Sequence, residues 1–173
     1  MRSFQATTGL MDLGTTASGS AIACLSNPAG SGITLIIKRI SARLGFVGTP
    51  AATGISFGLV RGTGVAAAGS GSASGATIGK RRPSSDNAIA LWRFGPTPIS
   101  VVADDSVGDM KTVFLNHQVG SPLWDEVIED VKEMEETDPL AIAPGTSLVI
   151  RTRTISIAGS RASFDFEWSE VPW

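Results

Sequence analysis

Hydrophobic and polar residues alternate with a period of two along several stretches of the chain, as they do in β-strands with one buried face. The first clear stretch is 39–46, where apolar and polar residues take turns: Ile40, Ala42, Leu44 and Phe46 against Arg39, Ser41 and Arg43. A second stretch, 54–61, places Ile55, Phe57 and Leu59 on one side. Because the turn cluster Gly48-Thr49-Pro50 separates the two stretches, we predict that they form an antiparallel pair.

Two more alternating stretches lie near the C-terminus. Before the first of them, Pro144-Gly145 predicts a tight turn in which the glycine supplies a positive φ. One face of the following strand carries Leu148, Ile150, Thr152 and Thr154, and the other carries Val149, Arg151, Arg153, Ile155 and Ile157. In the last strand Phe164, Phe166 and Trp168 are expected to point inward, and Asp165 and Glu167 outward. We predict that these two strands form a hairpin in which the arginines can pair with the acids, or with those of another subunit.

The middle of the chain contains shorter strand signals and one change of period. The stretch 88–94 alternates again, with Ala88, Ala90, Trp92 and Phe94 against Ile89, Leu91 and Arg93, and 99–103 and 111–115 are short apolar runs. In 121–136, by contrast, Leu123, Val127 and Val131 recur at intervals of four residues, and Ser121 and Pro122 fit the start of a helix. We predict one helix of about three to four turns that packs on a sheet. A long strand or an irregular excursion is the alternative.

About eight strands at regular spacing, separated by Gly/Pro turns, favour a mainly β fold of the antiparallel β-sandwich or jelly-roll type. Residues 1–31 are rich in Thr, Ser, Gly and Ala and are expected to form an extended N-terminal arm or an irregular first strand. Since the arm lacks a long apolar face, we expect partners to order it. Residues 32–173 are expected to form the β-sandwich domain, with a Gly/Ala-rich surface loop at 62–79.

The composition indicates what kind of surface the protein has. Charged residues make up 17% of the 173 residues, below the roughly 25% of ordinary globular domains. A surface that is poor in charge and rich in small residues suits burial against other subunits. The single cysteine excludes an intrachain disulfide. The chain shows no signal-peptide pattern at residues 1–10 and no apolar stretch of about 20 residues, so we expect assembly in a cytoplasm and no membrane partner.

Charge is unevenly distributed along the chain. Residues 1–82 hold eight basic residues and one acid, and residues 83–173 hold six basic residues and fifteen acids, which gives net charges of +7 and −9. The basic residues are scattered, so we do not expect direct nucleic-acid binding. Contact between subunits is the use that we predict for the charges. The candidate subunit-contact residues are Lys80, Arg81, Arg82, Arg151, Arg153, Asp165 and Glu167.

No motif for catalysis or for cofactor or metal binding is found. His117 is the only histidine, and no Gly-x-Ser-x-Gly sequence accompanies it. Cys24 lies in an apolar run, where cysteine acts as a small hydrophobe. Asp104, Asp105 and Asp109 lack the spacing of a calcium-binding loop, and 62–79 lacks a phosphate-binding pattern. We therefore predict no enzyme, and no catalytic, cofactor or metal site.

Two segments carry a resemblance to a known family. The sequence IAPGTSLVIRT at 142–152, followed by FDFEW at 164–168, resembles the C-terminal strands of small virion proteins of tailed bacteriophages. IKRISA at 37–42 and GTPAAT at 48–53 are similar to an early strand and turn of the same group. The resemblance implies a jelly-roll capsid cement or decoration protein on the surface of the virion. Its partner would be the major capsid protein, and it would be a homo-oligomer, with a trimer favoured.

Two other classes of function remain open. One is a tail or head-fibre component that contacts the host surface. The other is a carbohydrate-binding β-sandwich module, in which exposed Trp124, Trp168 or Trp173 would stack on sugar rings. A hydrolase is a more distant third.

Overall fold

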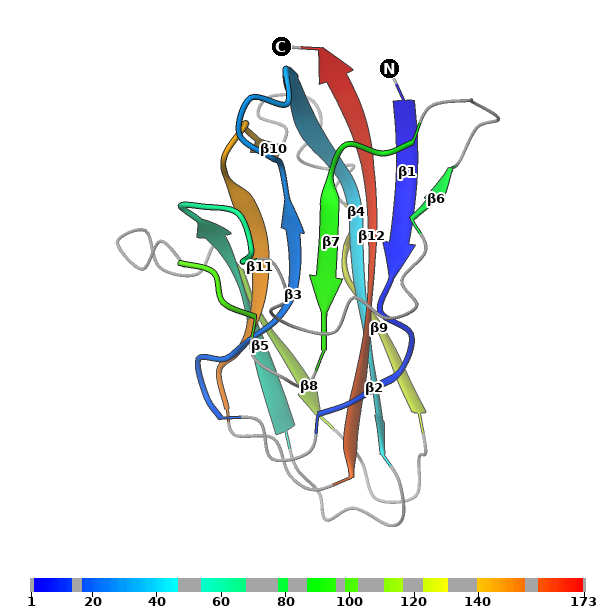
Figure 1. Ribbon diagram of the computed structural model, residues 1–173. Coiled ribbons are helices and arrows are strands. Elements are labelled where there is room, and N and C mark those ends of the chain that lie inside the picture. Colours follow the sequence, from blue (N-terminus) through cyan, green and yellow to red (C-terminus); the bar gives the residue numbers. More distant parts are fainter. Residues whose placement is uncertain are drawn as a thin grey trace.

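The computed structural model describes residues 2–13, 17–46, 54–67, 78–80, 87–95, 99–102, 111–116, 123–130, 140–154 and 159–172. For Leu44, Phe46 and the strands at 111–116 and 123–130 it describes the backbone alone. The described residues form two antiparallel sheets that lie face to face, and none of these residues is helical (Figure 1). The prediction of a mainly β, sandwich-like fold is therefore confirmed.

Two long strands, β4 (Ile33–Phe46) and β12 (Ser160–Pro172), pair with each other and form the centre of the seven-stranded sheet. Each has two short strands on its other edge: β1 (Arg2–Thr7) and β2 (Met11–Asp12) beside β12, and β10 (Ala141–Ile142) and β9 (Leu123–Asp130) beside β4. The two-residue strand β6 (Gly79–Lys80) pairs with β1. The two chain termini lie at the same end of the sandwich (Figure 1).

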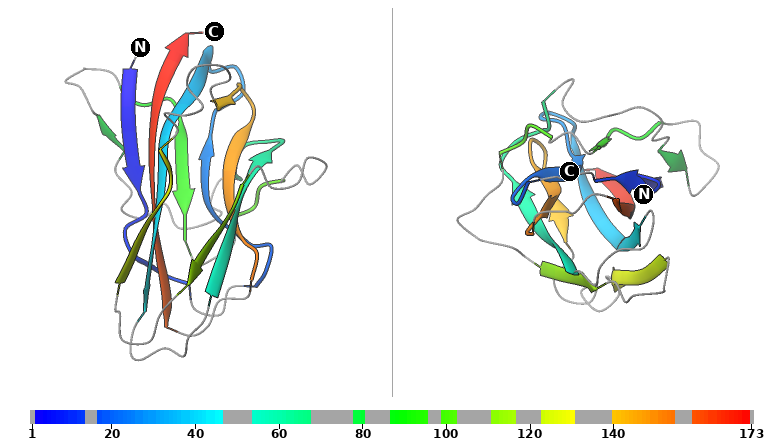
Figure 2. Two further views of the ribbon diagram at one scale, coloured as in Figure 1. Left: turned by 180° about the vertical axis from the view of Figure 1, so that it is seen from behind. Right: turned by 90° about the horizontal axis from the view of Figure 1, so that it is seen from below.

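The five-stranded sheet covers the other side of the core, in the order β7, β3, β11, β5, β8. The bounds of these strands, in that order, are Leu91–Phe94, Ala21–Ser26, Ser147–Thr152, Gly54–Gly62 and Lys111–Asn116. Along one side of the molecule β8 approaches β9 of the other sheet, so the two layers come together there (Figure 2).

The core lies between the two inner faces and follows the predicted alternation. Phe164, Phe166 and Trp168 of β12 are fully buried, as predicted. Across the core, the ring of Phe164 meets that of Phe57 edge-on at 5.1 Å, and the ring of Phe166 lies 4.8 Å from that of Trp92. Alternation also groups Ile55 with Leu59, Ala90 with Phe94, and Leu148 with Ile150 on common faces, and all six residues are buried in the core. Ile22 and Leu25 of β3 are buried there too, although they lie in a continuous apolar run without alternation. These contacts bury large apolar surfaces from both sheets, which is the main stabilising contribution in such a fold.

Strand β4 changes phase at Lys38. The buried apolar residues before it are odd-numbered and those after it are even-numbered: Ile33, Leu35 and Ile37, then Ile40 and Ala42. On the partner strand the neighbours Glu167 and Trp168 pair with Arg39 and Ile37, so Lys38 is one extra residue. This β-bulge allows both apolar runs of a single strand to face the same core.

A small second cluster covers the outer face of the five-stranded sheet. Cys24 and Val149 are fully buried there beneath Ala66 and Ile99. The two covering segments, 63–67 and 99–102, are joined by backbone hydrogen bonds: the Thr63 N–H donates to the Val102 carbonyl and the Ala67 N–H to the Ser100 carbonyl, both at 2.9 Å. The prediction that Cys24 behaves as a small buried hydrophobe is therefore confirmed.

Two predicted strand pairings are wrong. β4 and β5 belong to different sheets, and so do β11 and β12. β11 pairs with β3 and β5, whereas β12 pairs with β4, β1 and β2. The period of two identifies the inward residues, but consecutive strands here pack against each other across the core instead of pairing side by side.

The structure also differs from the predicted N-terminal arm. Within residues 1–31, β1 lies between β12 and β6, and β3 lies between β7 and β11. Phe4 and Leu25 are fully buried in the core. Because these strands pair on both edges and bury apolar side chains, the chain itself orders them without a partner.

The predicted helix at 121–136 is wrong for Leu123–Asp130, which forms strand β9 against β4. An interval of four residues is even, so Leu123 and Val127 satisfy the repeat of a strand as well as that of a helix. The rest of the predicted helix lies outside the described residues. So do residues 68–77 of the Gly/Ala-rich loop, whose first residue, Gly62, ends β5.

Candidate functional site

The outer face of the seven-stranded sheet carries rows of polar residues from three adjacent strands. Asp165 and Glu167 point outward on β12 because their neighbours Phe164, Phe166 and Trp168 point inward. The strand register then brings residues of β1 and β4 to either side of them: Gln5–Glu167–Arg39 in one row and Thr7–Asp165–Ser41 in the next. Arg43 follows Ser41 two positions along β4.

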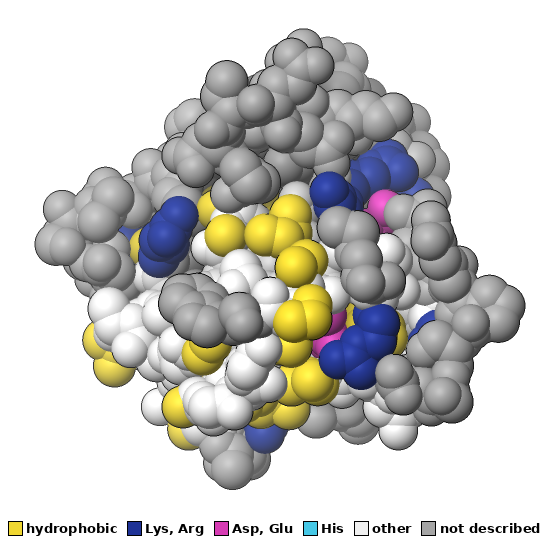
Figure 3. Space-filling view, turned by 90° about the horizontal axis from the view of Figure 1, so that it is seen from above, with side chains coloured by type: hydrophobic (Ala, Val, Ile, Leu, Met, Phe, Trp, Pro, Cys, Tyr) yellow, Lys and Arg dark blue, Asp and Glu magenta, His cyan; other side chains and the backbone are white. Residues whose placement is uncertain are grey.

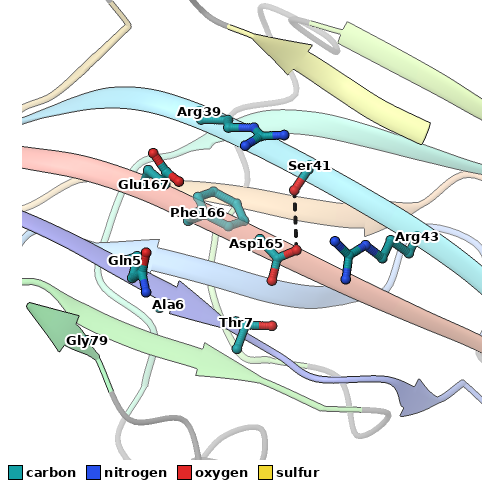
Figure 4. A pocket seen from close by; sticks show the side chains of 10 residues that line it. All are labelled: Gln5, Ala6, Thr7, Arg39, Ser41, Arg43, Gly79, Asp165, Phe166 and Glu167. Atoms are coloured by element: carbon teal, nitrogen blue, oxygen red, sulfur yellow. Dashed lines mark hydrogen bonds between the residues drawn. The ribbon is translucent and has the colours of Figure 1, made fainter. Parts of the chain in front are cut away.

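These rows line a groove of about 270 Å³, which we call the outer groove (Figure 4). Its lining comes from β1, β4, β6 and β12: Gln5, Ala6, Thr7, Arg39, Ser41, Arg43, Gly79, Asp165, Phe166 and Glu167. Gly79 of β6 forms its rim against Gln5. A Cβ atom added at Gly79 would lie 3.3 Å from the Cγ of Gln5, so the close approach of these two strands favours glycine.

The polar side chains of the groove include both charge signs. The hydroxyl of Ser41, which is nearly buried, donates a hydrogen bond to Oδ2 of Asp165 at 3.3 Å. Glu167 stands directly opposite Arg39 across the β4–β12 pair. Opposite charges in this position stabilise a sheet and hold one another in place. The arrangement suits non-covalent binding, since it offers fixed donors and acceptors.

The structure separates the candidate subunit-contact residues into three places. Asp165 and Glu167 line the outer groove, and Lys80 is exposed on β6 next to Gly79. Arg151 and Arg153 lie on and just after β11, in the other sheet, so they cannot pair with Asp165 and Glu167 as a hairpin would allow. Arg81 and Arg82 lie outside the described residues.

Sequence reasoning missed most of the groove. It identified Arg39, Ser41 and Arg43 as outward residues of one strand, but it gave no function to them or to Gln5 and Thr7. The missing information was the pairing of β12 with both β1 and β4, which joins residues from the two ends of the chain. Alternation alone indicates which face of its strand a residue lies on, but it does not indicate which strands lie beside that strand.

A second hollow, of about 230 Å³, lies between β10 and the adjoining parts of β5 and β11. Its lining combines apolar residues in and beside β10 with four polar residues: Arg61, Thr63, Thr146 and Ser147. We found no chemistry there beyond that of a gap between the two sheets.

The remaining chemical predictions concern metals, aromatics and membranes. The part of the chain that the structure describes holds no group of three or more His, Cys, Asp or Glu side chains placed to bind a metal ion. His117, Asp104, Asp105 and Asp109 lie outside that part. Trp168 is fully buried and cannot stack on a sugar, whereas Trp173 and the side chain of Trp124 are not described. Within the described ranges, no helix has the length and hydrophobicity to cross a bilayer.

No protein-family model, no curated protein and no solved structure matches this chain.

Proposed function

We propose that the protein is a structural virion component, a jelly-roll cement or decoration protein that binds and bridges the major capsid subunits of a tailed phage head. The antiparallel two-sheet fold and the resemblance of 142–152 and 164–168 to virion proteins support this proposal. The protein would sit on the capsid surface and would bind without catalysing a reaction.

The observation that carries the proposal is an apolar strip at the end of the sandwich where both termini lie. Seen from this end, hydrophobic side chains gather in a strip across the middle, with Lys and Arg side chains on both sides (Figure 3). Strand ends and turns at this end supply partly exposed apolar residues: Pro28, Ala29, Ala143, Pro144, Val171 and Pro172. An apolar centre with a polar and charged rim is the usual composition of a protein–protein interface.

The strip rests on a rigid base. Gly145 has the predicted positive φ, 79°, and its N–H donates to the Asn27 carbonyl at 2.8 Å, which joins the turn after β10 to the turn after β3. Turns that are fixed before binding lose little conformational freedom on binding. A capsid subunit that covers the strip would therefore gain the apolar burial at a small entropic cost.

A matched pair of substitutions tests the proposal. Val171 is half-buried at the end of β12, and Val102 is exposed on the segment that covers the other sheet. Val171→Asp should abolish co-sedimentation with heads of the encoding phage from which this protein has been stripped, and Val102→Asp should leave it intact. Heads that carry the wild-type protein should also release their genome at a higher temperature than the stripped heads do. Absence of the protein from purified particles, or binding to tails or to host cells instead of heads, would overturn the proposal.

A trimer is the assembly that we propose, because jelly-roll proteins of this kind suit threefold positions on a capsid. Light scattering of the isolated protein should give the mass of three chains. A stable monomer in solution that is also monomeric on the particle would exclude the trimer.

A further inference from the structure

We infer that the outer groove is a binding site for a neutral, polyhydroxylated ligand, that is, a saccharide of one or two rings. This goes beyond the proposed capsid role, since the groove lies on the outer face of the seven-stranded sheet and the apolar strip lies at the end that carries the termini.

The first argument is the balance of charge in the groove. Among the residues of its lining that the structure describes are two guanidinium groups, Arg39 and Arg43, and two carboxylates, Asp165 and Glu167. The arginines would attract an anion and the carboxylates would repel it, whereas the carboxylates would attract a cation and the arginines would repel it. A neutral ligand is the class that neither pair repels.

The second argument is the supply of hydrogen-bonding groups. The arginines are donors only and the ionised carboxylates acceptors only, whereas the Gln5 amide and the Thr7 hydroxyl are both. A sugar hydroxyl also donates and accepts, so adjacent hydroxyls on a ring can use neighbouring donors and acceptors at once. The two rows of the groove alternate these types over a short distance, as Figure 4 shows for Arg39 beside Glu167 and for Arg43 beside Asp165.

The third argument is that the groove is formed before a ligand arrives. Asp165 is oriented by the hydrogen bond from Ser41, and the charged residues of the groove lie on β4 and β12, the two longest strands that the structure describes. Gly79 and Gln5 fix the rim by direct packing. Polar groups held by rigid strands bind with less loss of side-chain entropy.

Size and affinity follow from the same lining. The volume of about 270 Å³ lies just below the roughly 300–1,000 Å³ found for pockets that take drug-sized molecules, which suits a small ligand. Phe166, the one aromatic residue among the described residues of the lining, is fully buried with its ring against Trp92. The described residues of the groove therefore offer no ring for stacking on a sugar, and we expect dissociation constants on the order of millimolar from their hydrogen bonds.

The test is titration of the full-length protein with a panel of neutral oligosaccharides built from glucose, galactose, mannose or N-acetylglucosamine, followed by NMR and calorimetry. At least one should bind saturably and shift the backbone signals of Gln5, Thr7 and Ser41. Asp165→Asn should weaken binding by about tenfold or more, because a charged acceptor is lost. Asp12→Asn, the same change at an exposed position of β2 outside the groove, should leave binding unchanged.

Several results would overturn the inference. One is no saturable binding to any neutral sugar at concentrations up to tens of millimolar. Another is binding that Asp165→Asn leaves unaltered while its thermal unfolding matches the wild type. Preferential binding of an acidic peptide, or dimerisation through this face, would also contradict a neutral ligand. If sugars fail while the protein still binds heads, only this inference falls, and the proposed capsid function stands.

Discussion

Glu170 is a carboxylate buried inside the sandwich, with 1% of its surface exposed. Its Oε1 accepts hydrogen bonds from the backbone N–H groups of Ile89 at 2.7 Å and Ala90 at 3.0 Å, and its Oε2 lies 3.5 Å from Nη2 of Arg2. Ile89 and Ala90 lead into β7 of the five-stranded sheet, whereas Glu170 belongs to β12. Glu170 thus joins the end of β12 in the seven-stranded sheet to the segment that leads into β7 of the five-stranded sheet.

Replacing Glu170 should therefore destabilise the fold strongly. We expect Glu170→Ala to lower the free energy of unfolding by about 2–4 kcal/mol, because two buried N–H groups lose their acceptor and Arg2 loses its carboxylate partner. Glu170→Gln should cost less, since the amide oxygen still accepts both bonds. Urea denaturation measures both changes. Glu167→Ala on the outer face is the control, with an expected cost of about 1 kcal/mol or less. Equal midpoints for Glu170→Ala and the wild type would contradict the assigned role.

Cys24 gives the fold a dependence on alkaline pH. Burial raises the pKa of its thiol above the ordinary value of 9.0, although Ser26, Ser147 and Arg93 act in the opposite direction. In the unfolded chain the thiol ionises at its ordinary pKa, while in the folded chain it stays neutral. Stability should therefore be complete below pH 9.0 and fall as the pH rises above it, by at most about 1.4 kcal/mol per pH unit from this group.

Denaturation between neutral and alkaline pH tests this dependence. The chain has no tyrosine, so one other source of alkaline titration is absent. Cys24→Ala should have a shallower loss of stability above pH 9.0 than the wild type, whatever its stability at neutral pH. Identical slopes would show that the thiol does not contribute.

At the scale of elements, the sequence predicted well which faces of the strands point inward, but it predicted poorly which strands pair with each other. Alternation correctly identified Phe164, Phe166 and Trp168 as inward residues, because the face of a side chain in a strand depends only on local geometry. It also placed Phe57 and Trp92 on the faces of their strands that the structure buries. Pairing depends on contacts between distant residues, such as Arg2 with Glu170, and alternation carries no information about it. The outer groove also depends on pairing between distant residues, since its rows combine strands from both ends of the chain. It could not be predicted until that pairing was known.

Strand β1 is the element that departs most from the arm predicted for its segment. Phe4 is fully buried and its ring lies 5.9 Å from that of Trp168, so β1 supplies part of the core as well as a strand of the sheet. Phe4→Ala should lower the free energy of unfolding by about 3–5 kcal/mol, as other large truncations in cores do. Gln5→Ala, on the exposed face of the same strand, should change it by about 0.5 kcal/mol or less.

Thermal unfolding and limited proteolysis of the isolated protein measure this contribution. Wild-type residues 2–7 should resist protease, and Phe4→Ala should expose them. If Phe4→Ala were tolerated and protease removed this segment from the folded wild type, an arm ordered by partners would be the correct description after all.

At the scale of the whole molecule, Asn27 connects the two sheets at the end that carries the termini. It follows β3 of the five-stranded sheet and is fully buried. Its Nδ2 donates to the carbonyls of Ile33 at 2.8 Å and Ile142 at 3.0 Å, which belong to β4 and β10 of the seven-stranded sheet. Its Oδ1 accepts the hydroxyl of Ser31 at 2.7 Å. A single amide thus satisfies carbonyls from two strands of the opposite sheet.

The two sheets should therefore lose stability together when this amide is removed. Asn27→Ala leaves two buried carbonyls without their donor, and we expect a loss of about 2–4 kcal/mol in the free energy of unfolding. Asn27→Asp should be at least as damaging, because a carboxylate places a charge beside the same carbonyls and cannot donate to them. Ser31→Ala is the matched control: it removes the partly buried hydrogen bond to Oδ1 of Asn27 and two long ones, at 3.4 Å, with the backbone of Ile33. It should cost about 1 kcal/mol. Hydrogen exchange reports where the loss occurs. In Asn27→Ala we expect the amides of β11 and β12, one from each sheet, to lose protection by the same factor. Protection that falls only near 27–33 and 140–146, with β11 and β12 unchanged, would show that Asn27 holds a local turn and that side-chain packing alone keeps the sheets together.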